Sequence, residues 1–239
     1  MFTGGIFVEP LETPGVALIF TPHADDAEGG CGGTVSKWIK EGTEVYLVLA
    51  TDGRAGTSNA EVATNDLVDT REQEQADAAR VMGVKEVVNL RIHDGGLEDD
   101  AVLRGHLVEA IRRFKPDVVL TTEPYHRLNH SHRDHRTIGV VAQDACYPYA
   151  RDIYHFPEQI DAGLEPHKVG AILFWGSEDP DMFCDIGESI EIKIEALKQH
   201  KSQFLGRDPG EGSRNRAKQN GEKVGAEYAE IFRQVSFRR

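Results

Sequence analysis

The sequence predicts an α/β protein in which a mostly parallel sheet is flanked by helices. Short apolar, β-branched runs alternate along the 239 residues with segments of helical periodicity, which is the pattern of strands connected by crossover helices. The length suits one sizeable core, and no linker-like segment divides the chain. We therefore expect residues 1–239 to form a single Rossmann-like domain.

The individual elements follow from apolar run length and periodicity. Short segments rich in apolar and β-branched residues predict strands at 16–20, 44–50, 86–91, 117–122 and 169–175. Helical spacing predicts helices at about 28–41, 69–83, 99–114, 134–146, 188–204 and 223–234. The third helix is the clearest, because Leu103, Leu107 and Ile111 share one face and Pro116 follows its end.

The segment 206–221 differs from the rest of the chain. It is rich in Gly, Arg, Asn and Lys and contains almost no apolar residue, so the sequence predicts an exposed loop there. A mobile lid over a site and a simple solvated connection both fit this composition, and both interpretations stay open.

Composition limits the classes of partner. With 27 basic against 40 acidic residues, a net charge of −13 argues against nucleic acid and against an anionic membrane surface. No apolar run is long enough to cross a bilayer, and residues 1–15 lack the features of a secretory signal. The three cysteines, Cys31, Cys146 and Cys184, are far apart in sequence, which favours a reducing cytoplasm. An exposed region around Trp175 or Phe183 is a candidate interface for a homo-oligomer.

Polar side chains follow four of the predicted strands, at the point where each strand ends. The carboxyl ends of parallel strands meet at one edge of a sheet, where ligand crevices form. We therefore expect one composite site instead of polar residues scattered over both edges. The clusters are His23/Asp25/Asp26, Thr51/Asp52/Arg54, His93/Asp94 and the segment 123–135.

The first cluster has the spacing of a metal site. His23 and Asp26 lie three residues apart on a loop that enters a helix, so both can face one ion while Asp25 points elsewhere. A free carboxylate beside a metal can act as general base on the metal's water. Zinc catalysis needs about three protein ligands. Spacing does not choose the third ligand, which is left open among His126, His130, His132 and His135.

Simpler interpretations exist for two of these segments. Residues 130–135 can be a solvated helix start in which Asp134 serves as the N-cap. The glycine run 29–33 does not match a dinucleotide-binding loop, so we expect it to let backbone pack tightly beside the site. The chain has no G-x-S-x-G motif, and a serine hydrolase therefore lacks support.

With these residues assembled, the chain resembles the LmbE/PIG-L family of metal-dependent N-deacetylases and related amidases. Residues 22–28 and 30–34 are similar to the family's opening His-Pro-Asp-Asp motif, and residues 132–136 to its second motif, His-Pro-Asp-His. Ala24 and Arg133 stand where the family usually has proline, so we expect altered loop stiffness and added charge near the mouth of the site. Further similar segments lie at 51–56, 71–74, 93–97 and 193–203.

The resemblance implies a role for each matching position. It implies a Zn²⁺ site, and two histidines with one carboxylate would also suit Fe²⁺. His132 would steady the oxyanion, with Asp134 orienting or charging it. The other implied roles are metal ligation by His23, Asp26 and His135, general base catalysis by Asp25, and contacts to sugar hydroxyls by Arg71 and Asp94.

The leading hypothesis is a zinc-dependent hydrolase that removes the acetyl group from an N-acetylglucosamine-type sugar or a related small N-acylated molecule. One alternative is an amidase of a larger thiol–sugar conjugate. Another is a non-catalytic sugar- or nucleotide-binding protein on the same fold. For His200, on the predicted late helix, we favour a structural role over an approach to the site.

Overall fold

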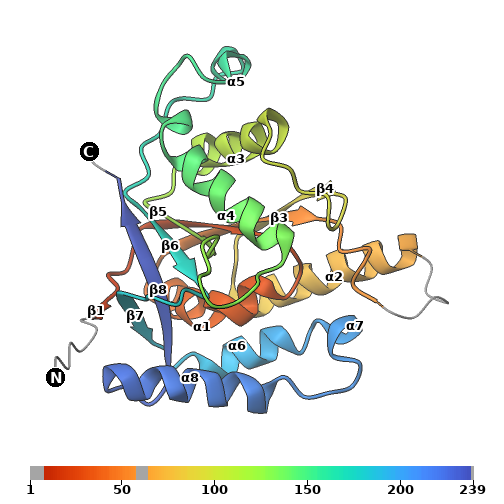
Figure 1. Cartoon of the computed structure of the whole chain (residues 1–239), viewed down its shortest axis with the longest axis vertical. Helices are drawn as coiled ribbons and strands as arrows, with labels where there is room; N and C mark the ends of the chain where they lie inside the picture. Colours follow the sequence, from red (N-terminus) through yellow and green to blue (C-terminus); the bar gives the residue numbers. More distant parts are fainter. Residues whose placement is uncertain (1–7, 58–63, 238–239) are drawn as a thin grey trace.

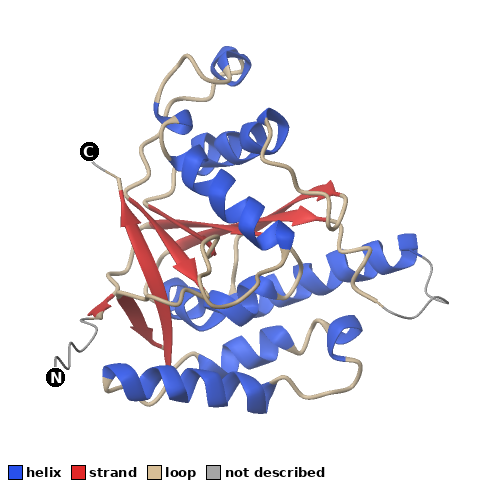
Figure 2. Ribbon diagram, in the orientation of Figure 1, coloured by secondary structure: helices blue, strands red, loops and turns tan. Residues whose placement is uncertain are grey.

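The computed structural model describes residues 8–57 and 64–237. In that part of the chain a sheet lies between two layers of helices (Figures 1 and 2), and the elements form a single α/β domain with a mostly parallel eight-stranded sheet. The expected fold class is confirmed. In chain order the elements are β1 (Glu9–Pro10), β2 (Val16–Thr21), α1 (Asp26–Lys40), β3 (Glu44–Thr51), α2 (Thr64–Met82), β4 (Glu86–Ile92), α3 (Ala101–Phe114), β5 (Val118–Thr122), α4 (Arg133–Cys146), η1 (Tyr149–Arg151), α5 (Pro157–Asp161), β6 (Ala171–Trp175), β7 (Met182–Asp185), α6 (Ile190–Leu197), α7 (Lys201–Phe204), α8 (Gly210–Val224) and β8 (Ala229–Ser236).

The order of the strands across the sheet is β1-β7-β8-β6-β5-β2-β3-β4. β8 runs antiparallel to both of its neighbours, β6 and β7, whereas the other pairs are parallel. The chain adds β3 and β4 on one side of β2 and then crosses over to add β5 and β6 on the other side. The order of connection therefore reverses at β2.

Each face of the sheet buries its own apolar cluster. Alternate residues of a strand point to opposite faces, and accordingly Ala17 and Ile19 join one cluster while Leu18 and Phe20 join the other. The first cluster is covered by α1, α6 and α8, with α2 beside α1 and α6, and the second by α3 and α4 (Figure 1). Both faces of β2 are thus dry, and its carboxyl end is held rigidly.

The glycine run in α1 allows close packing, as expected. A Cβ at Gly30 would lie 2.5 Å from the Trp175 ring, and one at Gly33 would lie 2.8 Å from Ile186. Larger residues at either position would push α1 away from β6 and from the segment before α6. The glycines therefore bring the amino end of α1 against the sheet, next to the segment that follows β2.

The prediction of an exposed loop at 206–221 was wrong, because Gly210–Val224 forms the helix α8. Few apolar residues are needed to hold it: Ala217 and Gly221 are buried against the rest of the fold. Arg214 forms a two-pronged salt bridge with Glu191 of α6: Nη2 donates to Oε2 at 2.6 Å and Nε donates to Oε1 at 3.2 Å. Gly225 ends the helix in the left-handed conformation at φ 76°.

The helix expected at 223–234 was also wrong. Residues Ala229–Ser236 form strand β8, which pairs with β6 on one side and β7 on the other. These pairings join distant segments, so a local helical pattern gives no sign of them. The helix expected at 188–204 is present but divided into α6 and α7, and the remaining predicted helices and strands agree with the structure apart from shifted ends.

Several other expectations can be compared with the structure. No helix among the described residues is long and apolar enough to cross a membrane. Residues 1–7, part of the segment that lacks a signal pattern, lie outside the described residues. Cys31, Cys146 and Cys184 are buried and free, and a cytoplasmic location stays a prediction.

Trp175 is only 7% exposed, because α1 packs on it, so it does not offer the expected exposed interface.

The buried ion pair between Lys193 of α6 and Glu230 of β8 ties this layer together, since Glu230 also accepts hydrogen bonds from Gly33 and Thr34 of α1. Lys193→Met would leave a buried carboxylate without its cation, and we expect the free energy of unfolding to fall by about 3 kcal/mol. Denaturant titration measures this change. The half-exposed Lys198→Met should change stability by less than about 0.5 kcal/mol, and equal effects of both substitutions would contradict this account.

Candidate metal centre

The site forms at the point where the connection order of the sheet reverses, between β2 and β5. Open α/β sheets bind ligands in crevices outside the carboxyl ends of their strands at such a switch point. The turn from β2 to α1 carries His23, Asp25 and Asp26, and the connection from β5 to α4 leads to His132 and His135. The two histidine- and aspartate-containing segments therefore meet although they are distant in sequence.

The polar clusters that the sequence placed at one edge do converge. Thr51 Oγ1, at the end of β3, donates to the carbonyl of Pro22 at 2.7 Å. The backbone N–H of Asp94 donates to Asp52 Oδ1 at 3.2 Å. Asp94 Oδ1 in turn lies 3.1 Å from His23 Nε2. The ends of β2, β3 and β4 are thus linked into one hydrogen-bonded edge.

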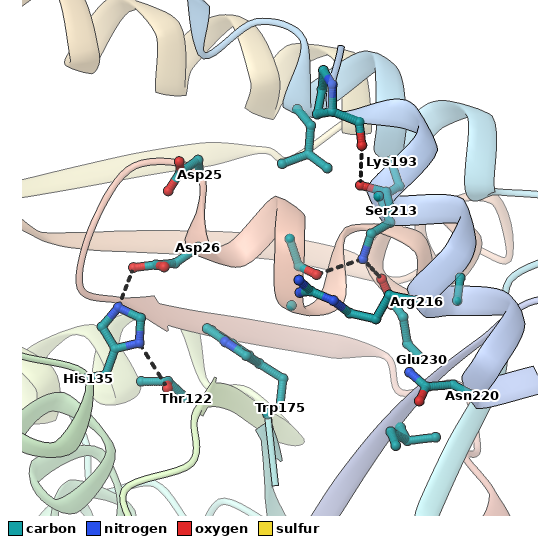
Figure 3. Close-up of a pocket in the computed structure, with 18 of the residues that line it drawn as sticks. Asp25, Asp26, Thr122, His135, Trp175, Lys193, Ser213, Arg216, Asn220 and Glu230 are labelled. Atoms are coloured by element: carbon teal, nitrogen blue, oxygen red, sulfur yellow. Dashed lines mark hydrogen bonds and ion pairs between the residues drawn. The ribbon is translucent and has the colours of Figure 1, made fainter. Parts of the chain in front are cut away.

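The turn after β2 has an unusual backbone conformation at Asp25, which adopts the left-handed region with φ 87°. A residue other than glycine pays about 1 kcal/mol for this conformation, so neighbouring contacts must hold it. Arg71, from α2, supplies such contacts: Nη2 donates to the carbonyl of Ala24 at 2.9 Å and Nη1 to that of Gly53 at 3.0 Å. The result is that the consecutive side chains of Asp25 and Asp26 both project into the pocket (Figure 3).

His23, Asp26 and His135 form a group that could hold a metal ion, with one ligand atom from each lying within 4.8 Å of the others. Asp26 Oδ2 is 3.1 Å from His23 Nδ1 and 3.1 Å from His135 Nε2. Two ligands of a tetrahedral zinc, each about 2.1 Å from the ion, lie about 3.4 Å apart. Thr122 Oγ1 approaches His135 Nδ1 at 3.5 Å, which leaves Nε2 for the site (Figure 3). The donors and their spacing therefore fit a divalent cation.

The other nitrogen of His23 faces two carboxylates. Its Nε2 lies 3.1 Å from Asp94 and 3.2 Å from Asp134. Burial lowers the pKa of His23, but Asp26 and Asp94 more than offset this effect and raise it to about 10. Metal-binding histidines commonly donate their second N–H to such a carboxylate, which fixes the ring and makes it a stronger ligand.

Asp134 is completely buried and belongs to this support of His23. Its carboxylate also accepts from the backbone N–H of Gly95 at 2.7 Å. It is not the N-cap of α4: that position is taken by His132, whose Nδ1 accepts from the N–H of Asp134 at 3.2 Å. The hydrogen bond from Asp134 to His132 is therefore made by the backbone N–H of Asp134. The Asp134 carboxylate instead contacts His23.

His132 stands at the open side of the group, with its ring exposed and centred 4.8 Å from that of His23. A neutral imidazole whose Nδ1 accepts a hydrogen bond carries its proton on Nε2. The backbone of α4 thus gives His132 an N–H that is available for a ligand.

Asp25 has a different environment from Asp26. Burial and the adjacent charge of Asp26 raise the pKa of Asp25 to about 7, although the cations His200 and Arg71 oppose the rise. For Asp26, burial acts in the same direction, but His135 and His23 outweigh it and hold the pKa well below its usual value. The pair therefore combines a carboxylate that stays ionised with one that exchanges a proton near neutral pH.

A buried group lies behind Asp25, and the sequence did not predict that its members meet. Glu28 and His200 are both fully buried, with His200 Nε2 3.4 Å from Glu28 Oε2, and Gln75 donates to the other Glu28 oxygen at 2.7 Å. Glu28 lies within the opening motif, but only the fold reveals that it meets the late helix. His200 is fully enclosed, in agreement with the structural role favoured above, and its charge is felt at Asp25.

Arg71 and Asp94, which the family resemblance assigned to sugar hydroxyls, have other contacts in the structure. Arg71 is 4% exposed and two of its guanidinium nitrogens bond to backbone carbonyls, so it stabilises the turn instead of presenting a free edge to a ligand. The Asp94 side chain is 8% exposed and faces His23. Arg133, expected near the mouth, donates to the carbonyl of Leu97 at 2.7 Å and pairs with Glu98.

A cavity of about 950 Å³ extends from the metal group. His126 and His130, two of the other candidates for the third ligand, line its wall but lie outside the group formed by His23, Asp26 and His135. The remaining candidate, His132, lies in a second group with His23, Asp94 and Asp134. Trp175 and residues of α8 also line it (Figure 3). The cavity is therefore larger than the metal group needs and has room for an extended substrate.

Comparison with known proteins gives consistent results. The profile of the family described as PIG-L, GlcNAc-PI de-N-acetylase, matches residues 18–146. A diacetylchitobiose deacetylase of Thermococcus kodakarensis is 33% identical over 82% of this chain and 73% of its own length. A probable N-acetyl-alpha-D-glucosaminyl L-malate deacetylase 2 of Bacillus cereus is 28% identical over 78% of this chain and 82% of its own. The N,N'-diacetylchitobiose deacetylase of Pyrococcus horikoshii, in complex with its inhibitor MPG, matches with a TM-score of 0.87 and 30% identity, over 95% of this chain and 86% of that one.

The sheet, its switch point and the His/Asp group there define an α/β enzyme with a candidate metal centre. Within that class the chain belongs to the GlcNAc-PI de-N-acetylase (PIG-L) family, as the motifs at 22–28 and 132–136 indicated. The named relatives are deacetylases, which places the chain among the hydrolases that act on carbon–nitrogen amide bonds.

The geometry predicts which histidine is needed to hold metal. In His135→Ala one of three ligands is lost, so we expect protein loaded with Zn²⁺ and then dialysed to retain far less metal than the unmodified protein. Elemental analysis measures the ratio of metal to protein. His130→Ala, which removes an exposed imidazole from the same cavity, should keep the full amount. Retention of metal by His135→Ala would contradict the assignment of this ligand.

Because Asp134 contacts His23 and is not itself a ligand of the proposed metal, Asp134→Asn should weaken metal binding less than His135→Ala does. This substitution keeps the shape of the side chain and removes the charge behind the ligand, so metal affinity should fall by about 10- to 100-fold. Competition with a chromophoric chelator measures the affinity. Asp144→Asn, farther along α4 and half-buried, is the matched control and should leave it unchanged. An unaltered affinity in Asp134→Asn would rule out this supporting role.

Proposed function

We propose that the protein is a metal-dependent N-deacetylase that hydrolyses the acetamido group of an N-acetylglucosamine-type sugar. The observation that carries the proposal is the presence of a free carboxylate, Asp25, beside the group of His23, Asp26 and His135. A site that only binds a sugar has no need of both. The relatives named for diacetylchitobiose and for N-acetylglucosaminyl malate support a sugar substrate of this type.

His23, Asp26 and His135 would hold the cation, with Zn²⁺ as the proposed ion and Fe²⁺ as the alternative that this donor set also suits. Such a cation, when bound, acidifies a coordinated water and polarises the amide carbonyl. Asp94 and Asp134 fix the orientation of His23 through its Nε2. The protein thus supplies two histidines and one carboxylate as ligands, and the carboxylates behind His23 hold its ring in position.

Asp25 is proposed as the general base. Its carboxylate accepts the proton of the attacking water and then donates that proton to the departing amine. A base works best when its pKa lies near the working pH, and burial raises the pKa of Asp25 to about 7. Within the described residues its side chain has no assigned hydrogen bond, so it is free to act on the water.

His132 is proposed to donate from Nε2–H to the oxygen that becomes negatively charged as the amide carbonyl is attacked. One such donor typically contributes about 3 kcal/mol to transition-state stabilisation. The N–H of Asp134 at Nδ1 supports this tautomer. The position of His132 beside both other imidazoles puts it next to the proposed reaction centre.

The two alternative functions have distinct consequences. A non-catalytic binding protein would release no acetate from any N-acetylated sugar, with or without added metal. An amidase of thiol–sugar conjugates would cleave those conjugates faster than simple N-acetylhexosaminides. Acetate and amine release from a panel of both substrate types, after EDTA treatment and after addition of Zn²⁺ or Fe²⁺, therefore separates the three functions and identifies the active ion.

Asp25→Asn tests the proposed chemistry. The amide cannot accept the proton, so kcat should fall by about 10²- to 10⁴-fold, while bound metal stays at the unmodified level because Asp25 is not a ligand. Acetate release and elemental analysis on the same sample give the two values. Asp208→Asn, which changes another carboxylate on the cavity wall, should remain active. Full activity in Asp25→Asn would remove Asp25 as the base.

A further inference from the structure

The cavity continues from the metal group to the surface of α8, which forms its far wall. Ser213, Arg216, Asn220 and Lys223 all line the cavity and recur at the spacing of one helical face. The adjacent face of α8 holds Ala217 and Gly221, which are buried against the fold, and Ala217 also lines the cavity. The orientation of α8 therefore turns a polar and basic face toward the proposed active site.

Within residues 8–57 and 64–237, no carboxylate neutralises the positive charge of Arg216. Among the described residues Arg216 has no carboxylate within salt-bridge distance, whereas Arg214 on the same helix is paired with Glu191. In Figure 3 the Arg216 guanidinium reaches from α8 into the cavity between Lys193 and Trp175. In a chain of net charge −13, an unpaired arginine that points into a cavity is a candidate for contact with an anion.

The acidic residues near this wall are already occupied. Glu230 accepts hydrogen bonds from Gly33 and Thr34 and pairs with Lys193. Asp208 Oδ1 accepts from the N–H of Gly210 at 2.9 Å, and the charge of Asp208 acts on Arg214. Neither carboxylate neutralises Arg216. The cavity thus has a metal end, with Asp25 and Asp26, and a basic end on α8.

Trp175 lies between the two ends of the cavity (Figure 3). Its ring is fixed by α1, since a Cβ at Gly30 would lie 2.5 Å from it, and Trp175, 7% exposed, contributes a small part of the cavity wall. An acetamido group at the metal end would then leave the rest of the substrate directed toward α8.

We propose that the substrate carries an anionic group, a carboxylate or a phosphate, attached to the sugar, and that Arg216 binds this group with help from Asn220 and Lys223. The inference rests on the proposed deacetylase function and adds the charge of the substrate to it. The planar guanidinium of arginine matches both anions in a two-pronged hydrogen bond. Lys223, whose Nζ lies 3.4 Å from Asn220 Oδ1, adds positive charge on the same face.

Steady-state kinetics with three N-acetylglucosamine substrates test the proposal: the neutral methyl glycoside, the 1-phosphate, and a glycoside whose aglycone bears a carboxylate. We expect one or both anionic substrates to have at least a 10-fold higher kcat/KM than the methyl glycoside. Arg216→Gln should reduce kcat/KM for the preferred anion by about 10- to 100-fold, mainly through KM, and change the methyl glycoside less than 2-fold. Lys218→Gln, on the solvent side of α8, is the control and should behave as the unmodified protein.

The two anionic substrates distinguish the possible sources of the charge. Preference for the neutral glycoside, or an equal effect of Arg216→Gln on charged and neutral substrates, would overturn the proposal. If no substrate releases acetate, the proposed function fails instead. Calorimetric binding of glucosamine 1-phosphate and methyl glucosaminide then still decides the charge question, because an anion site requires tighter binding of the phosphate and its loss in Arg216→Gln.

Discussion

The candidate site depends on the parallel pairing of β2 with β5. Ala17, Leu18 and Ile19 stand in register with Val118, Val119 and Leu120, so the two strands end side by side. The residues that follow each strand are therefore delivered to one crevice, where Asp26 meets His135. A change in register would separate the two motifs even if every ligand were present. The apolar packing on both faces of β2 thus determines the geometry of the site as much as the polar residues do.

Much of this arrangement could be predicted from the sequence. Five strands can be recognised in the sequence as runs rich in apolar residues, and a parallel sheet brings together the polar residues that follow their ends. The elements that failed are those whose stability comes from distant partners. β8 is a strand because β6 and β7 flank it, and α8 is a helix although its residues are almost all polar, because it is fastened by Ala217, Gly221 and the Arg214–Glu191 pair. Local propensity contains no information about such partners.

The sequence indicated which residues gather at the site. It did not indicate the contacts that each of them makes there. The group of His23, Asp26 and His135 comes together as the family resemblance implied. Other residues singled out by the resemblance make buried contacts within the protein. Arg71 donates to backbone carbonyls of the turn, and Asp134 and Asp94 face His23. Such differences follow from side-chain direction, which a motif of consecutive letters does not specify. The basic face of α8 was invisible for the same reason, because the segment was expected to be a loop.

The left-handed backbone at Asp25 has a consequence for how this family member can evolve. Glycine would adopt φ 87° without strain, so the most stable residue at this position is one that has no carboxylate. Selection for folding alone would favour that replacement, and selection for hydrolysis would oppose it under the proposed role of Asp25 as general base. With that role, stability and activity would compete at a single position. The buried contacts of Arg71 with the turn stabilise the strained conformation of Asp25.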